Sequence, residues 1–474
     1  MSGRLTWVAG LVCGLVLAGL PAAADTLALD EVLAQMDRRL PLLRAAEVER
    51  ELARTDLLSA QGAFDIGWQT RTAGVPLGYY QQLRIDSVIE QPTTLWGTSV
   101  FAGYRLGAGS FADYDGKLVT NDLGEWRAGV KVPLWRNGPI DRRRANLARA
   151  EVGLSVADLT VLQQRLELSR TAAQRYWDWV AAGRRQQVVR KLYALAQRRD
   201  RDLGALVTAG QVAAIERVEN ARALAQRQAQ VVAAERSLQQ STIELSLYVR
   251  DTAGAPVLTA PERLPGGFPE PVVLSAARLS QDLATAVGAR PEARRFDMQK
   301  DQAGIELSWA QNQLAPGIDF TLAASQDVGA GSKTRLPTVL EATILLDVPL
   351  QTRVATGRAD NAKALITRLE AQTEFARDRI RADVQDAVSA LDAARQRVAV
   401  ARTELGLANK VEVAERTKFL LGDSTLFIVN LREQATADAA IREIDALLDF
   451  HRSLAAYRAA IGEDAAALAA AARD

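Results

Sequence analysis

Val132-Pro133-Leu134, followed by Arg144-Ala145-Asn146, is the stretch that decides the fold, because the chain repeats it near residue 348. The second occurrence reads Val348-Pro349-Leu350 and continues as Arg358-Ala359-Asp360-Asn361. In both places a segment of alternating polar and apolar residues precedes it, and a long stretch rich in Ala and Leu follows. Self-similarity over units of this size indicates one architectural module used twice.

The correspondence extends to both sides of these motifs. Pro41 matches Pro291 at an offset of 250, and Gly210 matches Gly422 at an offset of 212. Each copy therefore reads helix, β segment, long helix, glycine turn, long helix. This order divides the chain into a first repeat at 25–250, a Pro- and Gly-containing connector at 251–290, a second repeat at 291–465 and a C-terminal tail at 466–474.

Residues 1–24 have the pattern of a secretory signal peptide. Arg4 is followed by an apolar run from Leu5 to Leu20 and by the small residues of Pro21-Ala22-Ala23-Ala24. A retained membrane anchor is the alternative, but the segment is short for a span and has the wrong flanks. Cys13 is the only cysteine. After cleavage the chain has no disulfide and no thiolate metal site.

The charge balance argues against nucleic acid as a partner. The chain has 58 Lys and Arg against 57 Asp and Glu, and removal of Arg4 makes them equal. Nucleic-acid-binding proteins show a basic excess instead. No second run of 18 apolar residues follows the signal peptide. An exported chain of this kind is either soluble or crosses a membrane as a β-barrel.

Residues 139–250 and 353–465 are predicted to form long helical hairpins. The second hairpin carries apolar residues at alternating steps of four and three, which is typical of coiled-coil packing. The stripe consists of Ile380, Val384, Ala387, Leu391, Ala394, Val398, Ala401, Leu405 and Ala408. A helix of about 70 residues is roughly 100 Å long. An ordinary soluble bundle, the alternative, would divide such lengths into shorter helices.

The β segments at 64–136 and 318–349 alternate between one apolar and one polar face. Trp126, Ala128, Val130 and Val132 alternate with Arg127, Gly129 and Lys131 in the first, for example. Strands of about ten residues with this pattern fit a membrane barrel. A soluble sandwich explains the alternation equally well, but the signal peptide and the charges on the polar face favour the barrel. Eleven aromatic residues lie in 64–136, as an interfacial girdle requires.

The two β segments differ in length. From Gln61 to Val132 the first copy has 71 residues, whereas from Gln311 to Val348 the second has 37. The excess of 34 residues includes two further strand-like segments, and we predict an extra hairpin near residues 82–106. Whether this hairpin adds barrel strands or forms a loop at the membrane is left open by the sequence.

With these features in order, the chain resembles the TolC family of outer-membrane efflux proteins, the outer membrane factors. The resemblance covers essentially the whole mature sequence. It includes the turn Ala209-Gly210-Gln211-Val212-Ala213 and the turn Leu421-Gly422-Asp423-Ser424-Thr425, where the second matches the family form Gly-x-Ser-x-Leu-x-x-Val best.

The resemblance implies an α+β membrane protein. Three copies would form one outer-membrane β-barrel continued by a long periplasmic α-helical barrel of coiled-coil hairpins, in a Gram-negative cell. It implies a passive exit duct of a tripartite efflux pump or a type I secretion system. The expected partners are a homotrimer, outer-membrane lipid, a periplasmic adaptor (membrane fusion protein) and an inner-membrane pump of RND or ABC type. No cofactor is expected.

The resemblance also assigns the candidate site to the tip turns, which meet the adaptor and gate the channel. These residues are Gly210, Gln211, Gly422, Asp423, Ser424 and Thr425. The glycines suit a left-handed turn, and the polar residues of the second turn suit a helix cap. Glu216 is a candidate for a charged pore ring, although Ile428 at the matching place of the second copy halves any such ring.

Two other classes of protein were compared with the duct. A periplasmic coiled-coil adaptor also has long hairpins and β domains, but adaptors carry one hairpin where this chain has two. An enzyme would need a nucleophile with a base, or clustered ligands. His451, the only histidine, stands alone in a helical segment and is expected to be a packing or surface residue. The sequence therefore favours a protein without catalytic chemistry.

Overall fold

The computed structural model describes residues 26–464, so the predicted signal peptide and the C-terminal tail lie outside the described residues. Residues in contact divide the chain into two compact units. The tip unit comprises the described parts of Met1–Gln35, Ala172–Pro271 and Arg397–Leu448. The sheet unit comprises Met36–Thr171, Val272–Gln396 and the described part of Asp449–Asp474.

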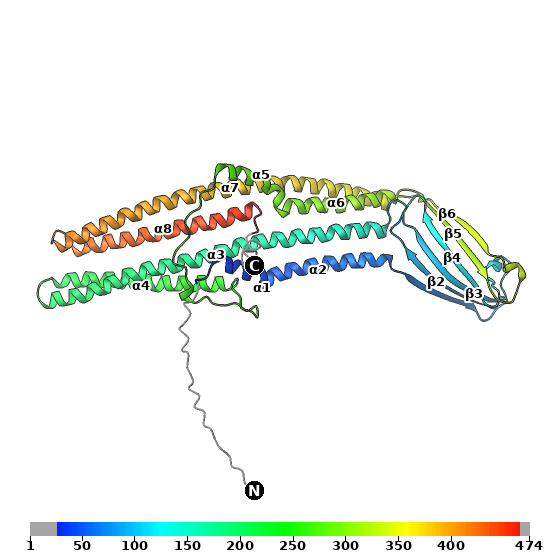
Figure 1. The fold of residues 1–474 in the computed structure, drawn as a ribbon, viewed down its shortest axis with the longest axis horizontal. Helices are drawn as coiled ribbons and strands as arrows, with labels where there is room; N and C mark the ends of the chain where they lie inside the picture. Colours follow the sequence, from blue (N-terminus) through cyan, green and yellow to red (C-terminus); the bar gives the residue numbers. More distant parts are fainter. Residues whose placement is uncertain (1–25, 465–474) are drawn as a thin grey trace, which may run out of the picture. The chain divides into compact units, whose positions relative to one another are not determined.

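The helices follow one order twice along the chain (Figure 1). The first set is α1 (Leu29–Arg39), α2 (Pro41–Gln61), α3 (Arg142–Thr208) and α4 (Ala214–Ser246). The second set is α5 (Ala276–Ala289), α6 (Pro291–Asn312), α7 (Arg353–Leu420) and α8 (Leu426–Ala460). Both α2 and α6 begin at a proline, which is favoured at the first helical position because its missing N–H is not needed there. The predicted connector at 251–290 contains α5.

The sheet is a six-stranded antiparallel meander with the strands in chain order (Figure 1). The strands are β1 (Gly67–Val75), β2 (Gln82–Pro92), β3 (Ser99–Gly109), β4 (Glu125–Pro133), β5 (Gly317–Asp327) and β6 (Val339–Asp347). Strands β1 to β4 lie between α2 and α3, and strands β5 and β6 lie between α6 and α7. The additional hairpin predicted near residues 82–106 is β2–β3, and it continues the sheet on both sides instead of forming a loop.

The register places the apolar positions of the strands on one face. Val130 of β4 lies opposite Leu322 of β5, which lies opposite Ala342 of β6, and Val100 of β3 lies on the other side of Val130. Because strand side chains alternate with a period of two, Arg127 and Lys131 then share the opposite face. The sheet therefore has one apolar and one charged face, as the alternation predicts.

Helix α3 enters from the sheet through a turn fixed by Asp141 and Arg144. The Asp141 carboxylate accepts the Arg144 backbone N–H at 3.0 Å, which satisfies one of the free donors at the helix start. The Arg144 guanidinium donates back to the carbonyl oxygens of Asn137 and Gly138, at 2.7 and 2.8 Å. The Arg144-Ala145-Asn146 motif thus closes the strand-to-helix junction.

The core of the tip unit is built around aromatic residues of α3. Trp179 and Val180 are almost fully buried, with Leu245 of α4 and Leu448 of α8 in the same cluster. The Tyr176 hydroxyl donates to the carbonyl oxygen of Leu27 at 2.9 Å. Burial raises the pKa of this phenol, so it remains a neutral donor. The stretch before α1 is thereby attached to α3.

The predicted coiled-coil stripe is buried. The α7 positions from Ile380 to Ala401 in that stripe are all buried, whereas Leu405 and Ala408 are half-buried. Helix α3 has a looser apolar stripe in which Leu162 is half-buried and the other residues are buried, namely Leu159, Leu166, Ala173, Tyr176 and Val180. The heptad prediction is therefore confirmed for α7. Within the described part of the chain, every helix is too short or too polar to be a candidate membrane span.

Candidate functional site

The two glycine turns have the same backbone geometry. Gly210 has φ +71° and Gly422 has φ +86°, both in the left-handed region that favours glycine. After α3, the Gly210 N–H bonds to the Val207 carbonyl at 3.0 Å. The Gln211 N–H bonds to the Leu206 carbonyl, also at 3.0 Å. This pair of bonds is a Schellman motif, and it ends the helix without leaving these carbonyls unpaired.

The turn after α7 repeats this motif. The Gly422 N–H bonds to the Phe419 carbonyl at 3.1 Å, and the Asp423 N–H bonds to the Lys418 carbonyl at 2.9 Å. Ser424 donates its hydroxyl to the Glu415 carboxylate of α7. Thr425 immediately precedes α8, and its carbonyl accepts the N–H of Val429. Ser424 thus holds the turn against α7.

Glu433 of α8 contacts one arginine from each of the helices α3, α4 and α7 of the tip unit. Arg199 of α3 donates to its carboxylate at 3.1 Å and Arg227 of α4 at 3.2 Å. Arg416 of α7 donates at 3.0 Å. The side chain of Asn430, one turn earlier on α8, accepts a further bond from Arg199 at 2.6 Å. We call these five residues the Glu433 cluster.

The Glu433 cluster is an ionic contact inside the packed helices. The Glu433 side chain is 1% exposed and the Arg227 side chain 3% exposed. Burial raises the pKa of Glu433, but the hydrogen bond and charge of Arg199, with the bond from Arg416, outweigh it and hold that pKa below its ordinary value. Burial lowers the pKa of the Arg227 guanidinium, and the Glu433 charge opposes this change. Both groups are therefore charged at neutral pH and depend on each other.

A cavity of about 740 Å³ lies beside this cluster, between the two tip turns. Its wall is largely apolar, with Leu203 and Leu206 of α3 facing Phe419 and Leu426 of the other hairpin. The polar residues of the wall are Arg198, Arg199, Asp202, Glu216, Arg416, Ser424 and Thr425. The structure therefore brings three of the predicted site residues, Glu216, Ser424 and Thr425, to one cavity.

The other predicted site residues lie outside this cavity. Gly210, Gln211, Gly422 and Asp423 are exposed on the turns themselves. Glu216 is half-buried in the first turn of α4, on the cavity wall. The predicted site therefore consists of two exposed turns and a shared cavity behind them.

The charged face of the sheet carries ion pairs between strands. The Arg105 guanidinium of β3 donates to Glu125 of β4 at 2.8 Å. Lys131 of β4 donates to Glu90 of β2 at 3.2 Å. Arg127 of β4 pairs with Asp86 of β2. Each of these cations is matched by an anion, so this face is hydrophilic without a large excess of either sign.

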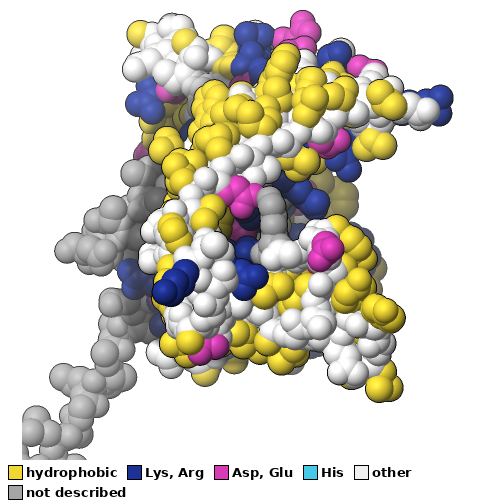
Figure 2. Space-filling model, turned by 90° about the vertical axis from the view of Figure 1, so that its right-hand side faces the viewer, with side chains coloured by type: hydrophobic (Ala, Val, Ile, Leu, Met, Phe, Trp, Pro, Cys, Tyr) yellow, Lys and Arg dark blue, Asp and Glu magenta, His cyan; other side chains and the backbone are white. Residues whose placement is uncertain are grey.

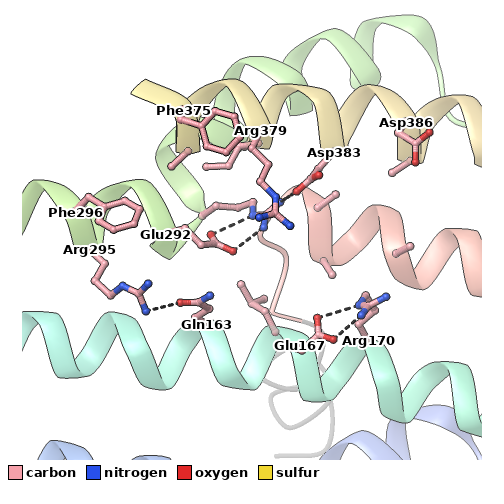
Figure 3. Close-up of a pocket in the computed structure, with 18 of the residues that line it drawn as sticks. Gln163, Glu167, Arg170, Glu292, Arg295, Phe296, Phe375, Arg379, Asp383 and Asp386 are labelled. Atoms are coloured by element: carbon pink, nitrogen blue, oxygen red, sulfur yellow. Dashed lines mark hydrogen bonds and ion pairs between the residues drawn. The ribbon is translucent and has the colours of Figure 1, made fainter. Parts of the chain in front are cut away.

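The sheet unit has a cavity of its own, of about 1160 Å³, between α3, α6, α7 and the end of α8 (Figure 3). Arg290 bridges Glu292 and Asp383 in its wall, at 2.6 and 2.8 Å. Burial lowers the pKa of Arg290, and the two carboxylates more than compensate, so the net pKa is raised. The wall also holds the pair of Arg170 with Glu167 (Figure 3). Arg290 thereby links the start of α6 to α7, whereas the pair of Arg170 with Glu167 lies within α3.

Metal-ligating side chains do not cluster into a metal site among residues 26–464. In this range no group of three His, Cys, Asp or Glu side chains could hold a metal ion. His451 is buried, with its ring 5.3 Å from that of Phe450 in an edge-to-face contact. It is therefore a packing residue of α8.

The Glu433 cluster was not predicted from the sequence. Its members come from four helices, and Glu433 and Arg199 are 234 residues apart in the chain. An acidic residue within a helix rich in charged residues gives no local signal of burial. Only the apolar neighbours Leu426 and Val429, at helical spacing on the same side, indicate that this part of α8 faces inward.

By sequence, the chain matches no protein-family model and no curated protein. By structure, it is similar to the open state of the Neisseria gonorrhoeae MtrE outer membrane channel, with a TM-score of 0.64 and 17% identity over 92% of this chain and 88% of MtrE. The Campylobacter jejuni CmeC outer membrane channel gives a TM-score of 0.63 and 12% identity, over 92% of this chain and 86% of CmeC.

The Vibrio cholerae outer membrane protein VceC gives a TM-score of 0.63 and 14% identity, over 92% of this chain and 96% of VceC. Near-complete coverage in both directions means that the similarity extends over the whole fold rather than over a shared fragment. This chain therefore has the fold of these outer-membrane channel proteins.

Proposed function

We propose that three copies of this chain form a passive exit duct in the outer membrane of a Gram-negative cell, extending into the periplasm. In this proposal the duct belongs to the TolC family, performs no chemistry and passes cargo supplied by an inner-membrane pump through a periplasmic adaptor. The observation that carries the proposal is a sheet with an exposed apolar face, in a chain that has the fold of outer-membrane channels.

The apolar face of the sheet is suited to lipid. Leu340 is 71% exposed and Ile344 68% exposed, although both belong to an apolar strand face. Soluble monomers rarely expose contiguous apolar patches of this kind. Seen from the loop end of the sheet, hydrophobic side chains cover much of the visible surface (Figure 2). Contact with lipid tails would remove this surface from water.

Aromatic residues lie toward both ends of the strands. Trp68 is the second residue of β1 and Trp135 follows β4, both at the end of the sheet nearest the helices. Trp126 is the second residue of β4 at the other end, with its ring 5.2 Å from that of Tyr104. The nine residue-to-residue steps from Trp126 to Trp135, if extended as in a strand tilted by about 40°, span about 23 Å along the membrane normal. This matches the apolar band of about 25 Å in outer-membrane barrels.

The sheet edges require a partner. Every residue of β1 and of β6 is exposed, and these are the two edge strands. Unpaired N–H and C=O groups cannot face lipid, so a membrane sheet must close. Three copies joined through these edges would leave no free edge.

The tip would serve as docking surface and gate. Its two turns are exposed and have the same Schellman geometry, so they present similar shapes to an adaptor. Opening would require the hairpin α3–α4 to move against α7–α8. The Glu433 cluster joins these hairpins through Arg199 and Arg227, so it would oppose that motion.

Fractionation and cross-linking test this proposal. The full chain, expressed in a Gram-negative host, is expected in the outer-membrane fraction as a trimer extractable by detergent. Variants Gln211→Cys and Asp423→Cys should cross-link to a candidate adaptor, whereas Val400→Cys, exposed on α7 away from the turns, should not. Recovery as a soluble periplasmic monomer would contradict the proposal.

A further inference from the structure

The sheet contains more strands from the first repeat than from the second. Four strands precede α3 and two precede α7, and all six lie in one antiparallel order. The hairpin β2–β3 is fully integrated, since it is paired from Gln82↔Gly109 to Pro92↔Ser99 and each of its strands has a further neighbour. These strands therefore widen the sheet.

An even number of strands makes the two edges compatible. Because neighbouring strands alternate in direction, β6 runs opposite to β1. The β6 edge of one copy can then pair with the β1 edge of the next and keep the antiparallel order. Both edge strands have nine residues, so the two edges offer the same length for pairing.

We propose that three copies of this sheet close into an eighteen-stranded pore, in which the hairpin β2–β3 sets a lumen wide enough for a polypeptide. This inference rests on the proposed function, from which it takes the assembly of three copies. Each edge strand of the sheet would pair with an edge strand of another copy of the same chain.

The strand number and the strand tilt together set the width of the ring. Eighteen strands about 4.8 Å apart and tilted by about 40° form a ring of roughly 113 Å, which is about 36 Å across. Side chains fill about 5 Å on each side, half the distance between packed sheets, and leave a lumen of about 26 Å. Without β2–β3, twelve strands would give about 24 Å across and a lumen of about 14 Å.

The helices adjoining the sheet fit the wider ring. Helices α2, α3, α6 and α7 meet the sheet in one copy (Figure 1). Three copies would place twelve such helices in a ring, and at about 8–10 Å between axes its circumference is roughly 96–120 Å. This agrees with the circumference of about 113 Å for eighteen strands, whereas twelve strands at the same tilt give only about 75 Å. Six strands thus cover the same arc as four helices.

The charged face would line this lumen. Its ion pairs, such as Lys131 with Glu90 and Arg105 with Glu125, keep it hydrated with its charges largely balanced. Barrels of about 16–18 strands leave an aqueous channel in porins. The membrane part would then admit cargo regardless of charge, up to the size of an extended or small folded polypeptide. Selection would fall to the tip.

Labelling of a single cysteine from outside the cell measures the lumen. Thr321→Cys lies on the charged face of β5, opposite Lys131, and is placed in a Cys13→Ser background that removes the only native cysteine. Whole cells are treated with maleimide-linked polyethylene glycols of increasing diameter. Labelling is expected up to about 26 Å. Leu322→Cys, on the apolar face of the same strand, is the matched control and should not react with any hydrophilic probe.

Deletion of Gln82–Gly109 removes β2 and β3 and keeps an even strand number. In this variant the limit should fall to about 14 Å. If the deletion variant does not fold, the largest probe diameter that labels Thr321→Cys in the full chain decides between the two lumen widths.

Assembly is measured separately, with Gln69→Cys on β1 combined in turn with Glu341→Cys, Thr343→Cys or Leu345→Cys on β6. A disulfide-linked trimer together with labelling by the wide probes supports the inference. A disulfide-linked trimer that excludes probes above about 15 Å overturns the inference and leaves the proposed function intact. Absence of the trimer overturns the proposed function itself.

Discussion

Replacement of Glu433 by glutamine should open the tip of the helical hairpins. The substitution keeps the size of the side chain and removes the negative charge that three arginines share. Arg227 is then left 3% exposed without a carboxylate in hydrogen-bond contact, next to Arg199. Removal of one partner of a buried ion pair costs about 3–5 kcal/mol. At about 4 kcal/mol, the population of the locally opened tip rises roughly 1000-fold.

Hydrogen exchange detected by mass spectrometry on the detergent-solubilised assembly measures this change segment by segment. Peptides of α3 around Arg199 and of α8 around Glu433 should exchange much faster, whereas strand peptides should not change. Glu404→Gln is the matched control, because Glu404 of α7 pairs with Arg442 of α8 at 2.6 Å at an exposed position. Exposed pairs contribute little, so this variant should behave as the wild type.

A second substitution separates charge from shape. Arg227→Met added to Glu433→Gln removes the most buried unpaired cation, so exchange should return part of the way to the wild-type rate. If Glu433→Gln alone leaves the exchange of the tip helices unchanged, the cluster does not hold the hairpins together. The reasoning about the gate would then be wrong, although the fold would not be affected.

Three further changes test other parts of the structure. The pKa of Glu433 is held below its ordinary value, so the stability that this carboxylate gives the tip is complete above about pH 4.3. This stability is lost as the pH falls through the folded-state pKa of Glu433. Hydrogen exchange at the tip should therefore rise only under acid conditions. Gly422→Ala should lower the free energy of unfolding by about 1–2 kcal/mol in thermal unfolding, because the φ of Gly422 is +86°. The control Gly406→Ala lies inside α7 with open space around it and should be neutral or slightly stabilising. Equal effects of the two substitutions would contradict the left-handed turn. Gly97→Ala would place a Cβ 2.5 Å from a backbone carbonyl oxygen, at a φ of +64°, and should make the β2–β3 turn sensitive to limited proteolysis. The control Gly116→Ala, whose Cβ would have no atom within 4 Å, should not have this effect. Resistance of both variants to proteolysis would contradict this packing.

Local patterns of the sequence predicted most of the elements. Pro41 and Pro291, which match between the two repeats, are the first residues of α2 and α6, because proline suits the first turn of a helix. The spacing from Ile380 to Ala401 predicts the buried side of α7 because burial follows the helical period. Alternation also predicts strands near residues 82–106, since it depends only on neighbouring residues.

Contacts between distant segments could not be predicted in the same way. Whether β2–β3 joins the sheet depends on its pairing with β1 and β4, and alternation is the same for a separate hairpin. Burial of Glu433 depends on arginines supplied by three other helices, and each of those arginines looks like an ordinary surface charge in its own helix. Such contacts require the register between elements, which periodicity does not contain.

The two repeats differ at both ends, and this affects how a trimer would work. Helices α3 and α7 have 67 and 68 residues, so the helical parts are nearly equivalent. At the sheet end, however, the first repeat supplies the excess hairpin. At the tip, the cluster carboxylate comes from Glu433 alone, and the matching position of the first repeat, 212 residues earlier, is Ala221. A trimer would therefore have three ionic locks rather than six, each within one copy. Its opening should follow three-fold rather than six-fold symmetry, because each lock can be released only by moving the two hairpins of the same chain apart.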